Sequence, residues 1–102
     1  MNKQKIIEYF VYILTNKKKA MFYVGQSDNL IRRTWQHKHK LIDGFTKKYN
    51  LDKLVYFETY LTREEALLRE KQLKGWSKDK KLKLIKTINP ELIDLSEYWW
   101  LS

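Results

Sequence analysis

Apolar residues in this 102-residue chain gather in short runs that polar segments separate. The runs at 6–14 and 21–25 flank a polar loop at 15–19, which is the pattern of a β-hairpin with a longer loop. Another run at 54–60, LVYFETY, predicts a third strand. The first run is apolar almost throughout, which is typical of a strand covered on both faces.

The side chains of the hairpin strands divide between two faces, because successive residues of a strand point to opposite sides. In the first strand one face carries Glu8, Phe10, Tyr12 and Leu14, and the other carries Tyr9, Val11 and Ile13. In the second strand one side carries Met21, Tyr23 and Gly25. The hairpin is therefore expected to bring Tyr12 and Tyr23 together, and packing within the sheet alone would also account for such a pair.

A first helix is expected at 28–40, with Ser27 or Asp28 as its N-terminal cap. Its expected inward contacts are Leu30, Trp35 and Leu41. Its expected solvated residues are Arg32, Lys38 and Lys40. The polar stretch 42–50, which contains Gly44, predicts a connecting loop.

Two more helices are expected after the third strand. Thr62 caps the first of them, because Glu65 three residues later completes a capping box, and Gly75 is a good C-terminal stop. Ser77 or Asp79 opens the other, which ends before the Asn-Pro pair at 89–90 because the residue before proline avoids the helical region. One side of this last helix carries Leu82, Ile85 and Ile88.

Length and composition predict a single domain, 1–102, with a core at about 6–95. No apolar run approaches the roughly 20 residues that span a bilayer, so we expect no membrane partner. The first ten residues lack a small-residue cleavage site, which argues against a signal peptide. Cysteine is absent, which excludes disulfides and thiolate metal sites and agrees with a cytoplasmic location.

Basic residues outnumber acidic ones by 21 to 12, which gives a formal charge of +9. In so small a domain this excess favours a polyanionic partner. Nucleic acid fits better than a membrane, because the lysines are scattered rather than aligned along one stripe. The alternative is a basic surface without a partner. The candidates for contacts with backbone phosphates are the loop lysines Lys17, Lys18, Lys19, Lys47 and Lys48.

Three polar side chains carry more chemistry than a plain structural hairpin and its helices need. Arg33 and His37 are four residues apart on the first helix and therefore share a face. His37 and His39 point in different directions, so they do not form a metal pair. Glu70 interrupts an apolar stripe, where a carboxylate needs a cation, a metal ion or several hydrogen-bond donors. The alternative places Glu70 at the edge of the stripe, paired with a neighbouring lysine.

Taken together, these residues resemble the GIY-YIG endonucleases. The matching features are FVY at 10–12, YVG at 23–25, Arg33, His37, and Glu70 within REKQLKGW. The resemblance extends over about 9–95 and is closest to small stand-alone members similar to the N-terminal nuclease domain of the excinuclease C subunit. The chain departs from the family at Phe10, where the family name has glycine, and at Val11 and Val24, which replace two isoleucines.

The resemblance implies an α/β (α+β) fold with a three-stranded antiparallel sheet flanked by helices. It implies that Tyr12 is the general base for water and that Tyr23 is its partner in the site. Arg33 would neutralise charge on the phosphoryl oxygens, and His37 would position water or the phosphate. Glu70 would hold one divalent metal ion, Mg²⁺ or Mn²⁺, because one carboxylate with waters and a phosphate suits magnesium.

The implied function is a metal-dependent endonuclease that hydrolyses DNA, or alternatively RNA, with Asn89 as a further polar group of the site. Because nothing resembles a base-reading helix, we expect selection of DNA structure rather than sequence, in DNA repair or recombination. A second hypothesis is a catalytically silent nucleic-acid-binding module with the same fold. A third is a structural protein whose tail, Tyr98-Trp99-Trp100, forms a dimer contact. The sequence leaves monomer and homodimer both open.

Overall fold

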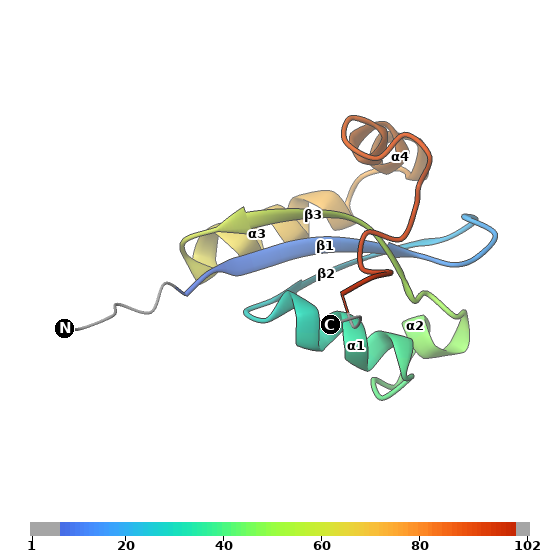
Figure 1. The fold of residues 1–102 in the computed structure, drawn as a ribbon. Helices are drawn as coiled ribbons and strands as arrows, with labels where there is room; N and C mark the ends of the chain where they lie inside the picture. Colours follow the sequence, from blue (N-terminus) through green and yellow to red (C-terminus); the bar gives the residue numbers. More distant parts are fainter. Residues whose placement is uncertain (1–6, 100–102) are drawn as a thin grey trace.

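The computed structural model describes residues 7–99, so the predicted start of the first strand at residue 6 lies outside the described residues. As predicted, the chain forms a three-stranded antiparallel sheet flanked by helices (Figure 1). In chain order the elements are β1 (Tyr9–Thr15), β2 (Phe22–Ser27), α1 (Leu30–Lys38), α2 (Phe45–Lys48), β3 (Lys53–Tyr60), α3 (Arg63–Lys74) and α4 (Lys78–Lys86). The central strand is β1, between β2 and β3. No helix within residues 7–99 combines the length and the apolar character needed to cross a membrane.

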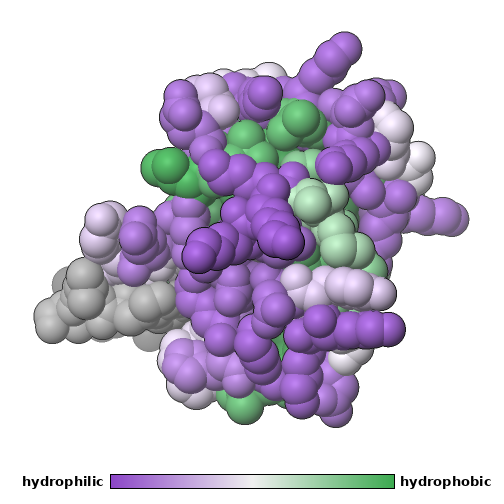
Figure 2. Space-filling model, turned by 90° about the vertical axis from the view of Figure 1, so that its right-hand side faces the viewer, coloured by the Kyte–Doolittle hydropathy of each residue, from purple (hydrophilic) through white to green (hydrophobic). Residues whose placement is uncertain are grey.

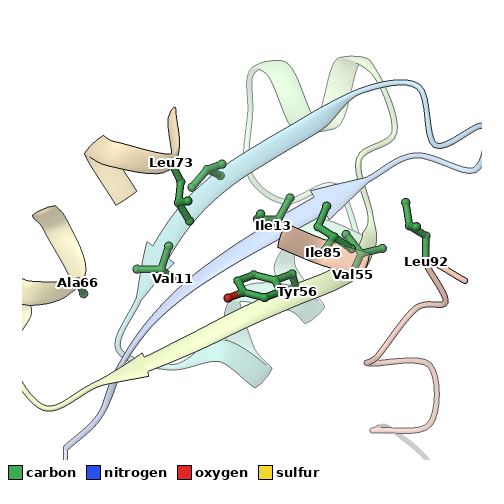
Figure 3. Close-up of a cluster of buried hydrophobic side chains, with 9 residues drawn as sticks. Val11, Ile13, Val55, Tyr56, Ala66, Leu73, Ile85 and Leu92 are labelled. Carbon is green, nitrogen blue, oxygen red and sulfur yellow. The ribbon is translucent and has the colours of Figure 1, made fainter. Parts of the chain in front are cut away.

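The central strand β1 sends alternate side chains into two clusters, as its alternation predicted. On one face Tyr12 and Leu14 pack with Leu30 of α1. The cluster on the other face joins β1 and β3 to α3, α4 and the C-terminal segment (Figure 3). Its members labelled in Figure 3 are Val11, Ile13, Val55, Tyr56, Ala66, Leu73, Ile85 and Leu92. Burial on both faces explains why the sequence of β1 is apolar almost throughout.

The capping signals for the helices after β3 are confirmed. The Thr62 hydroxyl accepts the backbone N–H of Glu65 at 3.2 Å and donates to its carboxylate at 2.8 Å. Gly75 ends α3, and Ser77 caps α4 by accepting a backbone N–H with its side chain. The last helix ends at residue 86, however, so Ile88, which was expected on one side of this helix with Leu82 and Ile85, lies beyond it and is 59% exposed.

Helix α1 begins later than the sequence predicted. The side chain of Asn29 accepts the backbone N–H of Arg32 at 3.0 Å, so Asn29 is the N-cap rather than Ser27 or Asp28. Ser27 instead continues β2, and its hydroxyl oxygen accepts the backbone N–H of Asn29 at 3.0 Å. Ser27, Asp28 and Asn29 all have short polar side chains that can cap a helix. Residue type alone therefore does not decide which of them is the N-cap.

The buried face of α1 is also different from the predicted one. Its buried residues are Leu30, Thr34 and His37. Trp35 and Leu41, which were expected to point inward, are 42% and 60% exposed. Lys38, which was expected in solvent, pairs with Asp94 at 2.5 Å, and its side chain is only 18% exposed. Polar side chains thus occupy the inner face of this helix.

The segment 42–50 is not only a loop, because its middle forms the four-residue helix α2. Gly44 precedes this helix with a φ of 113°, a conformation that side chains with a Cβ rarely adopt. The turn of helix buries Thr46, which is 6% exposed, and leaves Phe45 44% exposed. This local geometry sends the Thr46 hydroxyl toward α1.

The chain after α4 runs along the outer edge of β3 and supplies hydrogen bonds there. The register between β1 and β3 shifts beside Val55, whose carbonyl oxygen accepts the Nδ2 group of Asn89 at 3.0 Å. The carbonyl oxygen of Leu54 accepts the backbone N–H of Leu95 at 2.7 Å. The side chain of Asn89 also donates to the carbonyl of Ile93 and accepts its N–H. This segment therefore covers the start of β3, at an edge that a three-stranded sheet would otherwise leave open.

Candidate active site

Three aromatic rings meet where the hairpin faces α1. The ring centroids of Tyr12 and Tyr23 are 6.4 Å apart. The ring of His37 lies 5.9 Å from the first and 5.8 Å from the second. The two tyrosines share one face of neighbouring strands, and His37 lies on the buried side of α1. The structure thus brings together three of the site residues that the sequence predicted.

Gly25 provides the space for this arrangement. It lies opposite Tyr12 in the β1–β2 ladder. A Cβ at this position would lie 2.5 Å from the Cζ and hydroxyl oxygen of Tyr12 and 2.9 Å from the Tyr23 ring. Such separations are far below van der Waals contact, so the tyrosine rings occupy the place of a side chain at Gly25. The sequence placed Gly25 at the end of the second predicted strand and within YVG at 23–25, whereas β2 continues to Ser27.

A chain of hydrogen bonds runs from the hairpin through α1 to α2. The hydroxyl of Tyr12 and Nε2 of His37 are 3.0 Å apart. On the other side of the ring, Nδ1 of His37 lies 3.0 Å from the hydroxyl of Thr46. All three side chains are buried. Thr46 could not be predicted from the sequence, because a threonine in a polar stretch beside lysines carries no signal of this contact.

Burial sets the protonation states of this chain of hydrogen bonds. Burial, and after it the positive charge of Arg33, lowers the pKa of His37 from 6.5 to about 4, so the imidazole is neutral at neutral pH. Burial raises the pKa of Tyr12 well above its usual value of 10, and Tyr23 and Glu70 raise it further, while Arg33 opposes them. The Tyr12 hydroxyl therefore carries its proton in the protein without substrate.

The two charged residues predicted for the site act on the same hydroxyl from different helices. Arg33 of α1 and Glu70 of α3 both contribute to the electrostatic field at Tyr12, with opposite signs. Arg33 also lowers the pKa of His37, which lies one helical turn further along α1. The phenol and the imidazole are thus in direct contact, and the guanidinium and the carboxylate act on the phenol through their charges.

Glu70 is a largely buried carboxylate on α3. Its side chain is 19% exposed and pairs with Lys74 at 3.4 Å, as the alternative interpretation of Glu70 had suggested. Within residues 7–99 no group of three or more histidine and acidic side chains could enclose an ion. A divalent ion at Glu70 would therefore take its other ligands from water and a substrate phosphate, which suits the hydration preference of Mg²⁺.

The lysines proposed to contact phosphates lie in the hairpin loop and in the short helix α2, at one end of the molecule. The hairpin tip and the end of α2 border a common pocket of about 270 Å³, with Lys17 and Lys18 on one side and Tyr49 on the other. Figure 2 shows this end of the molecule, where hydrophilic side chains cover most of the surface. The remaining loop lysines have local partners: Lys19 the carbonyl of Glu91, Lys47 the carboxylate of Asp43, and Lys48 the ring of Tyr49.

Two other features that the sequence proposed for function, Asn89 and the aromatic tail, make structural contacts within the fold. The amide of Asn89 is used in hydrogen bonds to the backbone of β3 and of the C-terminal segment, so we leave Asn89 out of the proposed site. In the aromatic tail, Tyr98 is 70% exposed, but Trp99 packs edge-on against Phe57, so the tail does not present every ring to solvent. The third ring of that tail, Trp100, lies outside the described residues.

Comparison with known proteins gives the family of this chain. Residues 8–83 match the model of the GIY-YIG catalytic domain, a span that contains β1, β2, α1, β3 and α3. The chain belongs to the GIY-YIG family. This domain is a nuclease domain, and its nucleases act on nucleic acid and generally use divalent metal ions. Phe10, at the place of the family's glycine, packs edge-on against Phe57 within the cluster that contains Tyr12.

Relatives of this GIY-YIG protein are small proteins of similar length. The UPF0213 protein SERP0126 of Staphylococcus epidermidis is 35% identical over 78 residues, which is 76% of this chain and 94% of that protein. A UPF0213 protein of Staphylococcus aureus is 36% identical over the same shares. The solution structure of the UPF0213 protein BH0048 from Bacillus halodurans is 26% identical, with a TM-score of 0.54 over 83% of this chain and 89% of that one. The chain is therefore similar to small stand-alone members of the family.

Proposed function

We propose that this GIY-YIG protein is a metal-dependent endonuclease that hydrolyses DNA phosphodiester bonds. The observation that carries the proposal is the buried hydrogen-bonded chain from Tyr12 through His37 to Thr46. The opposite charges of Arg33 and Glu70 act on its terminal hydroxyl. Hydrolysis of a phosphodiester needs a base for water and a positive charge for the phosphoryl oxygens, and these groups supply both.

The Tyr12 hydroxyl takes a proton from the attacking water and gives its own proton to Nε2 of His37. This direction requires that Nδ1 of His37 carries a proton and donates it to the hydroxyl of Thr46, which lies 3.0 Å away. Since the pKa of His37 is about 4, its Nε2 has a free lone pair at neutral pH. The transfer avoids a free phenolate, which burial makes unfavourable at Tyr12.

Arg33 binds and neutralises the phosphate in this scheme. Its positive charge acts on both Tyr12 and His37, and its guanidinium has planar donors that match phosphate oxygens. A bound phosphodiester also offsets the positive charge that lowers the pKa of His37. The imidazole therefore becomes a better proton acceptor when substrate is in place.

Glu70 is the metal ligand of the proposal. Glu70 would hold a divalent ion, Mg²⁺ by preference, which would polarise the phosphate and stabilise the leaving 3′ oxygen. To hold it, the Glu70 carboxylate would give up its exposed partner Lys74. The oxygen of water bonds to phosphorus and the bond to the 3′ oxygen breaks, which leaves a 5′-phosphate and a 3′-hydroxyl.

The hairpin and α2 lysines contact the backbone of the substrate. Contacts of this kind position DNA without reading its sequence. We therefore propose selection by DNA structure, which suits a role in repair or recombination. A strong preference for one sequence in a cleavage screen would contradict this part of the proposal.

Cleavage of labelled duplex, flapped and branched DNA with Mg²⁺ tests the proposal. The variants Tyr12→Phe, Arg33→Ala and Glu70→Gln should each lose at least about a hundredfold in rate, because each removes a group that acts on the reacting atoms. Matched controls are Tyr9→Phe, on the opposite face of the same strand, and Glu64→Gln, in the exposed first turn of α3. Both controls should cleave like the unmodified protein.

The same assay distinguishes the enzyme from a catalytically silent module. An enzyme cleaves only when a divalent ion is added, and its Glu70→Gln variant needs more of that ion. DNA binding without cleavage under any divalent ion would favour the silent module. Full cleavage by Tyr12→Phe and Arg33→Ala would remove these residues from the mechanism.

A further inference from the structure

A small apolar pocket lies beside the proposed site and has no part in the scheme above. Its volume is about 230 Å³, and its walls are Met21 and Phe22 from the hairpin, Phe45 from α2, and Lys78 and Lys81 from α4. Three elements far apart in the chain thus enclose one space. Its inner walls are aromatic or thioether side chains, and its charged groups both come from α4.

The pocket begins one residue away from the hydrogen-bonded site. Phe22 precedes Tyr23, which belongs to the aromatic triad, and Phe45 precedes Thr46, which contacts His37. Phe22 points to the opposite face of β2 from Tyr23, whereas Met21 packs with the cluster of Tyr12 and Tyr23. The pocket therefore lies at the free edge of β2, and a DNA strand that leaves the site around this edge passes it. Phe45 is 44% exposed, so its ring is open to such a ligand.

The charge at the pocket rim is positive and unbalanced. Helix α4 carries five lysines and one acidic residue, Asp79. Among the ion pairs within residues 7–99, none includes a lysine of α4. Lys80 lies over the ring of Trp76 at 4.3 Å, whereas Lys78 and Lys81 line the pocket. Figure 2 shows hydrophilic side chains with exposed apolar surface between them at this end of the molecule.

We propose that this pocket binds an unpaired DNA base, while Lys78 and Lys81 contact the phosphates on either side of it. Aromatic walls with a positive rim are the arrangement by which proteins hold single-stranded nucleic acid, because every base has a face that stacks. The volume is below that of pockets for drug-sized ligands, so it accommodates one base rather than two. A base inside a duplex cannot enter, since its faces are covered by its neighbours.

This inference rests on the proposed nuclease function and specifies its substrate class. The substrate is DNA with an unpaired nucleotide next to the cleaved bond, such as a flap or a branch. The loop lysines and α4 then hold two parts of one substrate, on either side of the catalytic cluster. Selection by DNA structure follows from the pocket, because only an unpaired base fills it.

Binding without divalent ions, followed by fluorescence anisotropy, tests the pocket separately from cleavage. Three labelled probes are compared: a duplex with a single-stranded flap, the same flap with abasic sites in place of its bases, and a fully paired duplex. The flap should bind about tenfold more tightly than either of the others, because stacking of one base accounts for a change of this size. The abasic flap keeps every phosphate, so any loss of affinity relative to the intact flap is due to the missing bases.

Two variants with controls assign the effect to the pocket. Phe45→Ala should lose the preference for the flap and keep its affinity for paired duplex, and thermal denaturation checks that it folds. Lys78→Gln should weaken flap binding more than Lys83→Gln, which removes the same charge from an exposed position of α4 outside the pocket. Equal losses in the two lysine variants would mean that only overall charge matters and would overturn the proposal.

The outcomes separate this inference from the proposed function. Tight flap binding that depends on Phe45, without cleavage under any divalent ion, supports the pocket and contradicts the nuclease. Cleavage by a protein that binds the abasic flap as tightly as the intact flap supports the nuclease and overturns the pocket.

Discussion

At the scale of single residues, the site depends on side chains that are buried although they are polar. His37 is 4% exposed and Thr46 is 6% exposed, and each has its polar atoms in the hydrogen-bonded chain. Burial keeps the imidazole neutral, and Thr46 fixes the orientation of its ring. A histidine in water would be partly charged near its usual pKa of 6.5 and free to rotate.

The lowered pKa of His37 predicts how stability depends on pH. The unfolded chain binds a proton at His37 below pH 6.5, whereas the folded protein does so only below about 4, so the free energy of unfolding falls as the pH falls between these values. The loss should be about 2 kcal/mol between pH 7 and pH 4.5, measured by urea denaturation. His37→Gln should flatten this part of the curve. An unchanged slope in that variant would show that His37 titrates alike in both states.

Gly25 gives a second prediction at this scale. Gly25→Ala should displace the Tyr12 ring, since the new methyl group would lie 2.5 Å from its hydroxyl end. We expect a loss of about 1–3 kcal/mol in stability and of nearly all cleavage. Gly75→Ala is the matched control, because a Cβ there would meet no atom closer than 3.5 Å. Denaturation and cleavage assays check both, and a fully active Gly25→Ala would contradict the tight packing.

At the scale of elements, an ion pair fixes each helix that carries a charged site residue. Glu58 of β3 accepts two hydrogen bonds from Arg69 of α3, at 2.8 and 2.9 Å, and further ones from Tyr56 and Tyr60. Burial alone would raise the pKa of the Glu58 carboxyl, but these donors outweigh it and hold the pKa below its usual value. Helix α3 is thereby fixed on the sheet, with Glu70 one residue beyond Arg69.

Helix α1 is fixed by Lys38 and Asp94, whose side chains are 18% and 11% exposed. Asp94→Asn should lower the free energy of unfolding by about 2 kcal/mol, because the amide keeps the acceptor oxygen but turns its NH₂ group toward the Lys38 ammonium. Asp43→Asn breaks the exposed pair with Lys47 and should have no measurable effect. Urea denaturation compares the two. Equal effects would mean that the Lys38–Asp94 pair contributes no more than a surface pair.

The elements that could be predicted from the sequence are those whose signals come from residues close together in the chain. Alternation along β1 correctly separated Tyr12 from Val11, and the Thr62–Glu65 capping box correctly placed the start of α3. The buried face of α1 was predicted wrongly, because hydrophobicity favoured Trp35 as an inward contact, whereas the buried face of this helix is partly polar. Thr34 can be buried there because its hydroxyl donates to the backbone of its own helix. His37 can be buried there because Tyr12 and Thr46, which are distant in sequence, satisfy its ring nitrogens.

The same reasoning explains which site residues could be predicted from the sequence. Tyr12, Tyr23, Arg33, His37 and Glu70 could be named because their spacing resembles a family pattern. Thr46 could not, since its role depends on where a four-residue helix places it relative to α1. The pocket lined by Phe45 could not be predicted from the sequence either, because its walls come from three elements that are far apart in the chain.

At the scale of the whole molecule, the charge of +9 makes binding to DNA dependent on salt. Each lysine that contacts a phosphate contributes roughly one to the slope of log affinity against log salt concentration. Lys17→Gln should therefore reduce the slope by about one. Arg63→Gln removes the same charge at the start of α3, where its guanidinium lies over Tyr9, and should reduce the slope by much less. Equal reductions would mean that the hairpin tip makes no direct contact.

The strip of chain that borders β3 has a practical consequence for anyone who prepares this domain. The family match stops at residue 83, but Asn89 and Leu95 still bond to the backbone of β3. A fragment trimmed to the matched boundaries would leave the carbonyl groups of Leu54 and Val55 without these donors. Bare strand edges recruit other strands, so such a fragment should self-associate into sheets where the longer chain stays dispersed.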